Sequence, residues 1–254
     1  MLAPRRVRPE GLVTERLRLA DGSETSLHLA AHSLAGVSVR VARLRRPAPL
    51  AAWCAGQGIG DAIVGGFFTR PAALPLGELR TRGMVRRFVP FLSPWHAERS
   101  CLHVERGRVS LARRDELAPE PRGDLLQAGP LLVAGGVPVV REGDDPEGFS
   151  AGAAQFDSDI TAERHPRAAI ALDGEGRVML VACDGRARGE AGLTLAELAE
   201  ALAARGAVSA LNLDGGGSTS LVCGGALANS PREGDGTPIV PGRPVPTAIA
   251  LVPR

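Results

Sequence analysis

Two aspartates in this sequence stand where carboxylate chemistry is most plausible, each at the end of an apolar run. Asp184 follows the run 177–183, and Asp214 follows the run 208–213. Paired carboxylates serve as acids, bases or nucleophiles when glycosidic bonds are hydrolysed. An Asp-Gly pair also commonly opens a tight turn. The pattern therefore leaves two alternatives: one shared catalytic site, or two separate turns.

The segment DGGGSTS, residues 214–220, is the sharpest local signal. Consecutive glycines let the backbone adopt left-handed conformations and approach a ligand closely, and successive exposed N–H groups can bind an anion. A flexible hairpin loop is the alternative, but such a loop rarely follows a capped helix and a buried strand with an aspartate at its head. We expect a ligand-binding turn formed by Gly215, Gly216, Gly217, Ser218 and Thr219.

A predicted helix over 194–206 separates the two apolar runs that end at these aspartates. Thr194 and Glu197 form a T-x-x-E capping box, apolar residues follow at helical spacing, and Gly206 suits the C-terminal end. The run 177–183, the helix and the run 208–213 have the lengths of a β–α–β unit. Its parallel strands would bring both carboxylates to one edge of the sheet, where ligands bind in α/β sheets.

Apolar alternation and turn signals elsewhere predict an α+β fold with mixed β-sheets, several hairpins and a C-terminal β–α–β unit ending in the glycine-rich turn. The expected strand is 36–44, and the expected hairpins are 102–111 and 168–183. Long loops are expected over 113–124 and 141–164. We predict a mobile N-terminal segment over 1–24 and one domain over 25–254.

Composition excludes several function classes. All 30 basic residues are Arg and the formal net charge is +2, so there is no P-loop or Schiff-base lysine and no electrostatic case for nucleic acid or an anionic membrane. Aromatic residues are only 3%, too few for nucleic-acid stacking platforms. The four Cys fit no zinc template, and no apolar run reaches ~18 residues. We expect no cofactor and, with no signal peptide seen, a cytoplasmic location.

Two arginines flank the predicted hairpin that leads to Asp184. Arg167 precedes it and Arg186 follows the aspartate by two residues. A guanidinium can hold a phosphate through two parallel hydrogen bonds. His165, close to Arg167, could enter such a site, whereas surfaces or strand faces are expected for the remaining histidines, His28, His32, His96 and His103.

The C-terminal third of the chain resembles the phosphodiester glycosidase family. Its typical elements are matched in order by Pro166–Arg167, Asp184–Gly185–Arg186, the helix from Gly192 to Leu198, and Leu213–Ser218. Further matches lie at VGGFF (64–68), AGPLLVAGG (128–136), Asn229 with Pro231, and Arg243–Val245. The chain departs from the family pattern at three positions: Val64 stands where the family has Asn, Ala168 where it has Thr, and Ala171 where it has Gly.

The resemblance implies hydrolysis of a sugar-1-phosphodiester at its sugar–O–phosphate bond, releasing a free sugar and a phosphomonoester. The expected substrate is a sugar phosphate or phosphoglycan, with N-acetylglucosamine as a candidate sugar, which places the chain in carbohydrate metabolism. The resemblance implies that the catalytic residues are Asp214, Asp184 and Arg167. It implies that the substrate-binding residues are Arg186, Gly215, Gly216, Gly217, Ser218, Thr219, Asn229, Arg243, Gly66 and Phe67.

Two other function classes compete with this reading. Val64 and Ala168 favour a non-catalytic carbohydrate- or phosphate-binding protein on the same fold. The same carboxylates would also serve a hydrolase of ordinary glycosides.

Overall fold

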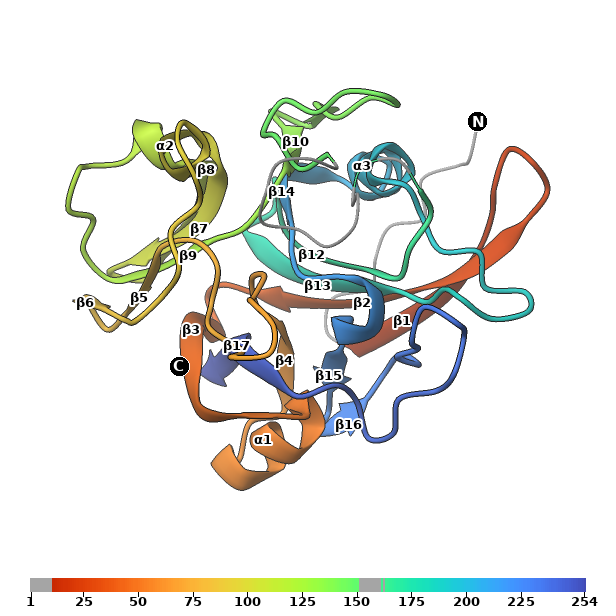
Figure 1. Ribbon diagram of the computed structural model, residues 1–254, viewed down its shortest axis with the longest axis horizontal. Helices are drawn as coiled ribbons and strands as arrows, with labels where there is room; N and C mark the ends of the chain where they lie inside the picture. The colour runs from red at the N-terminus through yellow and green to blue at the C-terminus, as the bar shows by residue number, and fades with distance from the viewer. Residues whose placement is uncertain (1–10, 151–160, 162) are drawn as a thin grey trace.

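Three β-sheets form the framework of the computed structural model, which describes residues 11–150, 161 and 163–254 (Figure 1). The largest sheet has seven strands, in the order β1 (Gly11–Arg18), β2 (Glu24–Ser33), β13 (Arg177–Cys183), β12 (Arg167–Asp173), β14 (Ala207–Asn212), β10 (Leu131–Ala134) and β11 (Val137–Pro138).

The two smaller sheets have five strands each. One has the order β16 (Ala226–Leu227), β15 (Leu221–Cys223), β4 (Asp61–Val64), β17 (Val245–Pro253) and β3 (Val37–Ala48). The other has the order β6 (Met84–Val85), β5 (Leu79–Thr81), β9 (Asp124–Gln127), β7 (Ser100–Glu105) and β8 (Arg108–Arg113). The helices are α1 (Leu50–Gln57), α2 (Trp95–Glu98) and α3 (Leu195–Ala203), with short 3-10 turns η1 (Arg114–Glu116) and η2 (Gly216–Ser218).

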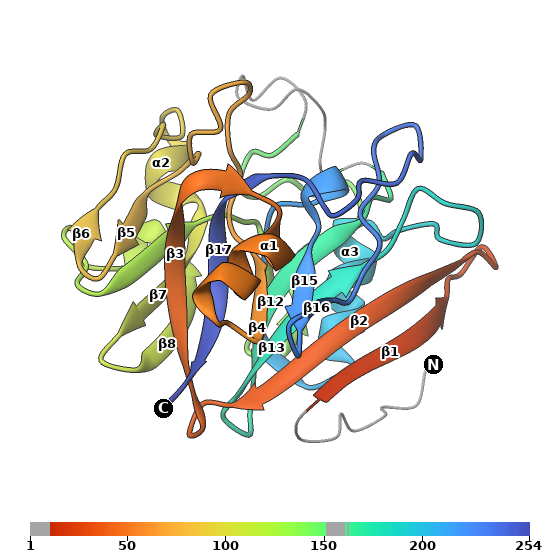
Figure 2. The same cartoon turned by 90° about the horizontal axis from the view of Figure 1, so that it is seen from below.

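The seven-stranded sheet is buried on both faces because its central strands carry apolar side chains at successive positions. Ile170 and Leu180 face a core shared with the two smaller sheets, whereas Ala169 and Val181 face the core beneath α3. Figure 2 shows the long β1–β2 hairpin extending along one side of this arrangement. The sheet is thereby a rigid support for the loops that leave its ends.

Helix α3 begins as its sequence predicts. The Thr194 hydroxyl accepts a hydrogen bond from the Glu197 amide at 3.1 Å, and the Glu197 carboxylate accepts one from the Thr194 amide at 2.9 Å. Leu195, Leu198 and Leu202 are buried against the sheet, which α3 covers on one face (Figure 1). The capping box and the apolar stripe are confirmed.

The sequence predicts mixed sheets, but every pairing between strands in the described part of the chain is antiparallel. β13 and β14 both pair with β12, which lies between them. They therefore run in the same direction, although they are not neighbours as in a simple β–α–β pair. The predicted hairpins are present as β7–β8 and β12–β13.

The N-terminal segment also differs from expectation where the structure describes it. Residues 11–18 form β1, paired along its whole length with β2, and Leu17 is buried against the core under α3. Residues 1–10 and most of 151–162, part of the expected 141–164 loop, lie outside the described residues. The helices of the described part are all too short or too polar to cross a membrane.

Candidate active site

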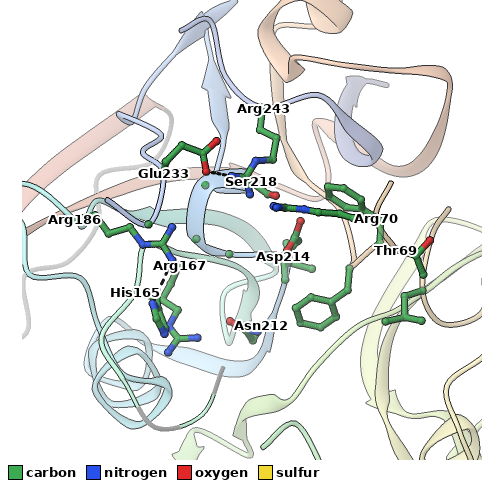
Figure 3. Close-up of a pocket in the computed structure, with 18 of the residues that line it drawn as sticks. Thr69, Arg70, His165, Arg167, Arg186, Asn212, Asp214, Ser218, Glu233 and Arg243 are labelled. Carbon is green, nitrogen blue, oxygen red and sulfur yellow. Dashed lines mark hydrogen bonds and ion pairs between the residues drawn. The ribbon is translucent and has the colours of Figure 1, made fainter. Parts of the chain in front are cut away.

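A cavity of about 600 Å³ opens where β14 ends and the triglycine turn begins (Figure 3). Its volume falls in the range of small-molecule sites. Polar and charged groups line it on the side of the turn, and apolar groups from the loop after β4 line the other side. The charged side chains among the lining residues are Arg70, Arg167, Arg186, Asp214, Glu233 and Arg243, with His165 beside them.

The triglycine turn accommodates two guanidinium groups at very close range. A Cβ on Gly217 would lie 2.5 Å from Nη2 of Arg243, and a Cβ on Gly216 would lie 3.3 Å from Nη2 of Arg186. Gly216 also has a φ of +58°, a left-handed conformation that favours glycine. The absence of side chains in the turn is therefore what allows two arginines to pack over it.

The turn itself is held by main-chain hydrogen bonds. The Gly216 amide donates to the Pro166 carbonyl at 2.8 Å, and the Asp214 amide donates to the Gly65 carbonyl at 3.0 Å. The Gly216 N–H is thus already committed and is not a free anion donor.

The carboxylate of Asp214 lies at the pocket but is poorly hydrated. Its side chain lines the cavity, yet its Oδ2 is buried and has no hydrogen-bond partner in the described part of the chain. Burial raises the pKa of Asp214 to about 7, although the Ser218 hydroxyl, the guanidiniums of Arg243 and Arg70 and the Gly215 amide all act to lower it. A carboxyl group with this pKa is suited to proton transfer near neutral pH.

Arg243 and Arg186 face each other above the turn with different partners. Arg243 forms an ion pair with Glu233. Arg186 donates to the Arg232 carbonyl at 3.3 Å and lies 3.5 Å from Nδ1 of His165. Burial and the nearby charge of Arg243 lower the pKa of Arg186. Two guanidiniums this close repel each other, so an anion between them would stabilise both.

Arg167 lines the same cavity from below and is almost fully buried. Its Nε donates to the Leu193 carbonyl and its Nη2 to the Glu163 carbonyl, both at 2.8 Å. These two main-chain contacts fix the guanidinium in place beside His165 (Figure 3). The structure thus brings Arg167, Arg186, Arg243, Asp214 and the triglycine turn together.

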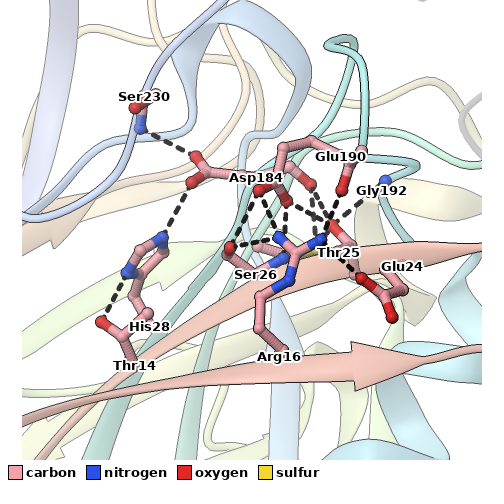
Figure 4. Close-up of polar contacts among 12 residues, drawn as sticks. Thr14, Arg16, Glu24, Thr25, Ser26, His28, Asp184, Glu190, Gly192 and Ser230 are labelled. Carbon is pink, nitrogen blue, oxygen red and sulfur yellow. Dashed lines mark hydrogen bonds and ion pairs between the residues drawn. The ribbon is translucent and has the colours of Figure 1, made fainter.

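Asp184 does not join this group, although β13 delivers it to the same edge of the sheet. It is outside the pocket lining, and its carboxylate is occupied on both sides (Figure 4). A 2.8 Å hydrogen bond joins its Oδ2 to Nε2 of His28, and its Oδ1 accepts from the Ser230 amide at 2.8 Å. His28 is itself buried and bonded through Nδ1 to the Thr14 hydroxyl at 3.0 Å. The expected convergence of two carboxylates in one pocket is therefore not what the structure has: Asp184 ties β2 to the loop that carries Glu233.

Three other expected binding residues also lie outside the pocket lining. Asn229 accepts from the Leu221 amide at 2.8 Å and donates to the Thr219 carbonyl at 2.9 Å, which braces the exit of the turn. Thr219 is fully buried. A Cβ on Gly66 would lie 3.0 Å from the Gln127 carbonyl, so Gly66 permits a close backbone approach. Phe67 and Ser218, by contrast, line the cavity as expected.

Among the lining residues that sequence reasoning missed are Arg70, Asn212 and Glu233. Asn212 precedes Asp214 by two residues, so strand alternation could have placed both on one face. Arg70 and Glu233 lie in loops, and no sequence pattern marks them. No group of three or more His, Cys, Asp or Glu side chains able to hold a metal ion occurs among residues that the structure describes.

The chain belongs to the phosphodiester glycosidase family, whose sequence model matches residues 58–252. A segment of 67 residues is 43% identical to N-acetylglucosamine-1-phosphodiester alpha-N-acetylglucosaminidase of Mus musculus, and one of 67 residues is 42% identical to that of Homo sapiens. The matched segment is 26% of this chain and only 13% of either relative.

Solved structures show the same fold at low sequence identity. The catalytic domain of the zebrafish N-acetylglucosamine-1-phosphodiester alpha-N-acetylglucosaminidase matches with a TM-score of 0.72 and 19% identity, over 96% of this chain and 83% of that one. A hypothetical protein from Synechocystis matches with a TM-score of 0.66 and 21% identity, over 96% of this chain and 62% of that one.

The bonds of Asp184 predict a structural cost for its loss. Asp184→Leu leaves His28 and the Ser230 amide without their acceptor, so we expect the free energy of unfolding to fall by ~3 kcal/mol in urea denaturation. Asp184→Asn keeps one acceptor oxygen and should lose about 1 kcal/mol. Equal stabilities of Asp184→Leu and the wild type would contradict this role.

The close approach at Gly217 predicts a loss of anion binding in Gly217→Ala. The added methyl group displaces the Arg243 guanidinium, so we expect the affinity for inorganic phosphate, measured by calorimetry, to fall ~10-fold or more. Gly56→Ala in α1, where φ is not positive and a Cβ meets nothing within 4 Å, is the matched control for adding a methyl group to a glycine. Unchanged phosphate affinity in Gly217→Ala would show that Arg243 does not need this space.

The raised pKa of Asp214 predicts how stability depends on pH. The pKa of the Asp214 carboxyl is near its ordinary value of 3.8 in the unfolded chain and about 7 in the folded one. The free energy of unfolding therefore falls as pH rises between these two values. Asp214→Asn removes this dependence, and we expect its Tm to exceed that of the wild type by about 3 °C at pH 8 and by much less at pH 5. An equal gain in Tm at both pH values would contradict the prediction.

Proposed function

We propose that this protein hydrolyses the sugar–O–phosphate bond of a sugar-1-phosphodiester, releasing a free sugar and a phosphomonoester. The observation that carries the proposal is a single poorly hydrated carboxylate, Asp214, next to two guanidiniums packed over a glycine turn. In such a pocket the guanidiniums suit an anion, and the adjacent carboxylate suits an electrophilic carbon. The family relationship supports the same reaction class.

The leaving group explains why one carboxylate can suffice. An ordinary glycosidase protonates a strongly basic leaving alkoxide with a general acid. Here the leaving group is a phosphate whose conjugate acid has a pKa of about 6. Its departure needs charge stabilisation more than protonation, and preorganised guanidiniums supply it. Arg186 and Arg243 take this role in the proposal.

Asp214 acts at the anomeric carbon, either as a nucleophile or as the base for an attacking water. In the net reaction, the bond from the anomeric carbon to the phosphate oxygen breaks and a water oxygen takes its place. The bonding electrons leave with the phosphomonoester, and the displaced water proton passes to Asp214 or to solvent. Arg167 holds the pocket floor through its main-chain contacts and contributes positive charge beneath the phosphate.

A non-catalytic binding protein is the second candidate function, and the departures from the family pattern at Val64 and Ala168 bear on it. Val64 and Ala168 are both fully buried, and neither belongs to the pocket lining. Their replacement of polar family residues therefore removes no side chain that lines the described cavity. This observation favours the catalytic proposal over simple binding.

Asp214→Asn tests the proposal. We expect the wild type to release free sugar from an N-acetylglucosamine-1-phosphodiester, with kcat/KM rising through pH about 7 as Asp214 ionises. Asp214→Asn should lose at least ~10³-fold in kcat/KM, whereas Asp144→Asn should retain full activity. Chromogenic glycosides without phosphate should be poor substrates. Ligand binding by calorimetry without any turnover in the wild type would support the binding-protein alternative, and equal rates for Asp214→Asn would remove Asp214 from the chemistry.

A further inference from the structure

Arg70 lines the cavity, yet no sequence motif singles it out. It lies in the loop between β4 and β5, which is held as a fixed turn. The Thr69 amide donates to the Leu74 carbonyl at 2.9 Å, and the Ala73 amide donates to the Thr69 carbonyl at 2.8 Å. A bridge between Phe68 and Pro75 closes the base of the turn. The backbone that presents Arg70 to the cavity is therefore well defined.

Figure 3 shows Arg70 reaching into the cavity from the side opposite Arg186, with its guanidinium directed toward Asp214 and Arg243. The positive charge of Arg70 acts on Asp214, since it lowers the pKa of that carboxyl against the effect of burial. Arg70 is therefore part of the electrostatic surroundings of the reacting carboxylate.

The donors of Arg70 are not committed within the protein. Arg243 has Glu233 as an ion-pair partner, and Arg186 donates to a main-chain carbonyl. Arg70 is exposed and has no hydrogen-bond or ion-pair partner in the part of the chain that the structure describes. A guanidinium offers two parallel N–H groups that match two phosphate oxygens. Arg70 is thus the pocket arginine with most donor capacity left for a ligand.

We propose that Arg70 is a substrate-binding residue that contacts the phosphate of the sugar-1-phosphodiester from the side opposite Arg186. This inference rests on the proposed function for the identity of the substrate. The cationic lining then encloses the scissile phosphate on three sides, with Arg243 between the other two guanidiniums. Four arginines against two carboxylates, Asp214 and Glu233, leave the lining cationic overall, as an anionic substrate requires.

Three variants test the inference. Arg70→Gln removes the charge and the paired donors, Arg70→Lys keeps the charge alone, and Arg46→Gln on an exposed part of β3 is the matched control. Binding of inorganic phosphate is measured by calorimetry, which needs no turnover. We expect affinity to fall ~10-fold or more in Arg70→Gln and less in Arg70→Lys, with no change in Arg46→Gln.

Kinetics give a readout that a merely structural role would not change. With an N-acetylglucosamine-1-phosphodiester as substrate, kcat/KM should fall by a similar factor in Arg70→Gln. Its rise with pH should move to higher pH, because the pKa of Asp214 increases when the nearby positive charge is lost. Inhibition by free sugar, which carries no phosphate, should stay unchanged.

The outcomes separate this inference from the proposed function. Phosphate affinity and kcat/KM within twofold of the wild type in Arg70→Gln would overturn the role of Arg70 even if the wild type is active. A wild type without hydrolytic activity whose phosphate binding still weakens in Arg70→Gln would overturn the proposed function and keep Arg70 as an anion-binding residue. An equal loss of free-sugar and phosphate binding would show general damage to the pocket and also overturn the inference.

Discussion

The close packing of two guanidinium groups over a turn without side chains is the interaction on which the site depends. A Cβ on Gly217 would lie 2.5 Å from Arg243 and would force it to move, and one on Gly216 would lie 3.3 Å from Arg186, which is already a tight contact. Bringing two like charges together costs free energy, and the protein offsets it only in part. Glu233 compensates one guanidinium, and a main-chain carbonyl accepts from the other. The pocket is consequently electrostatically incomplete without an anion, and in the proposed reaction this preorganisation would stabilise the developing negative charge.

The scaffold explains how these groups stay in place. β13 and β14 flank β12 and run in one direction, so the residues that follow them leave the same edge of the large sheet. The segments that follow β13 and β14 then have different structural roles. The residues after β14 form the pocket turn, whereas Asp184, after β13, is drawn into a buried contact with His28. The other carboxylate oxygen of Asp184 accepts from the Ser230 amide and so holds the loop bearing Glu233, which means that a carboxylate outside the pocket still supports the geometry of the pocket.

Local features of the fold and site could be predicted from sequence, and long-range ones could not. The capping box at Thr194, the turn at Asp214 and the hairpin of β12 and β13 depend on neighbouring residues, so their patterns are visible in the chain. The position of Asp184 depends on His28, which is far away in sequence and pairs through β2. The predicted mixed sheet was wrong for a related reason: β12 inserts between β13 and β14, so these two strands of the same direction are not neighbours, and no local pattern encodes that order. Arg70 shows no pattern because loop arginines are common in a protein whose basic residues are all arginine.

The arrangement of β12 between β13 and β14 also determines when the site forms during folding. The walls of the cavity come from residues as far apart as Arg70 and Arg243, and they meet only after strands distant in sequence have paired. Contacts of this kind form slowly, since loop-closure entropy is lost before any contact compensates it. Partly folded chains therefore lack the anion site altogether. A ligand of the proposed class, a sugar phosphate, would bind the finished fold alone and, by mass action, shift the refolding equilibrium toward it.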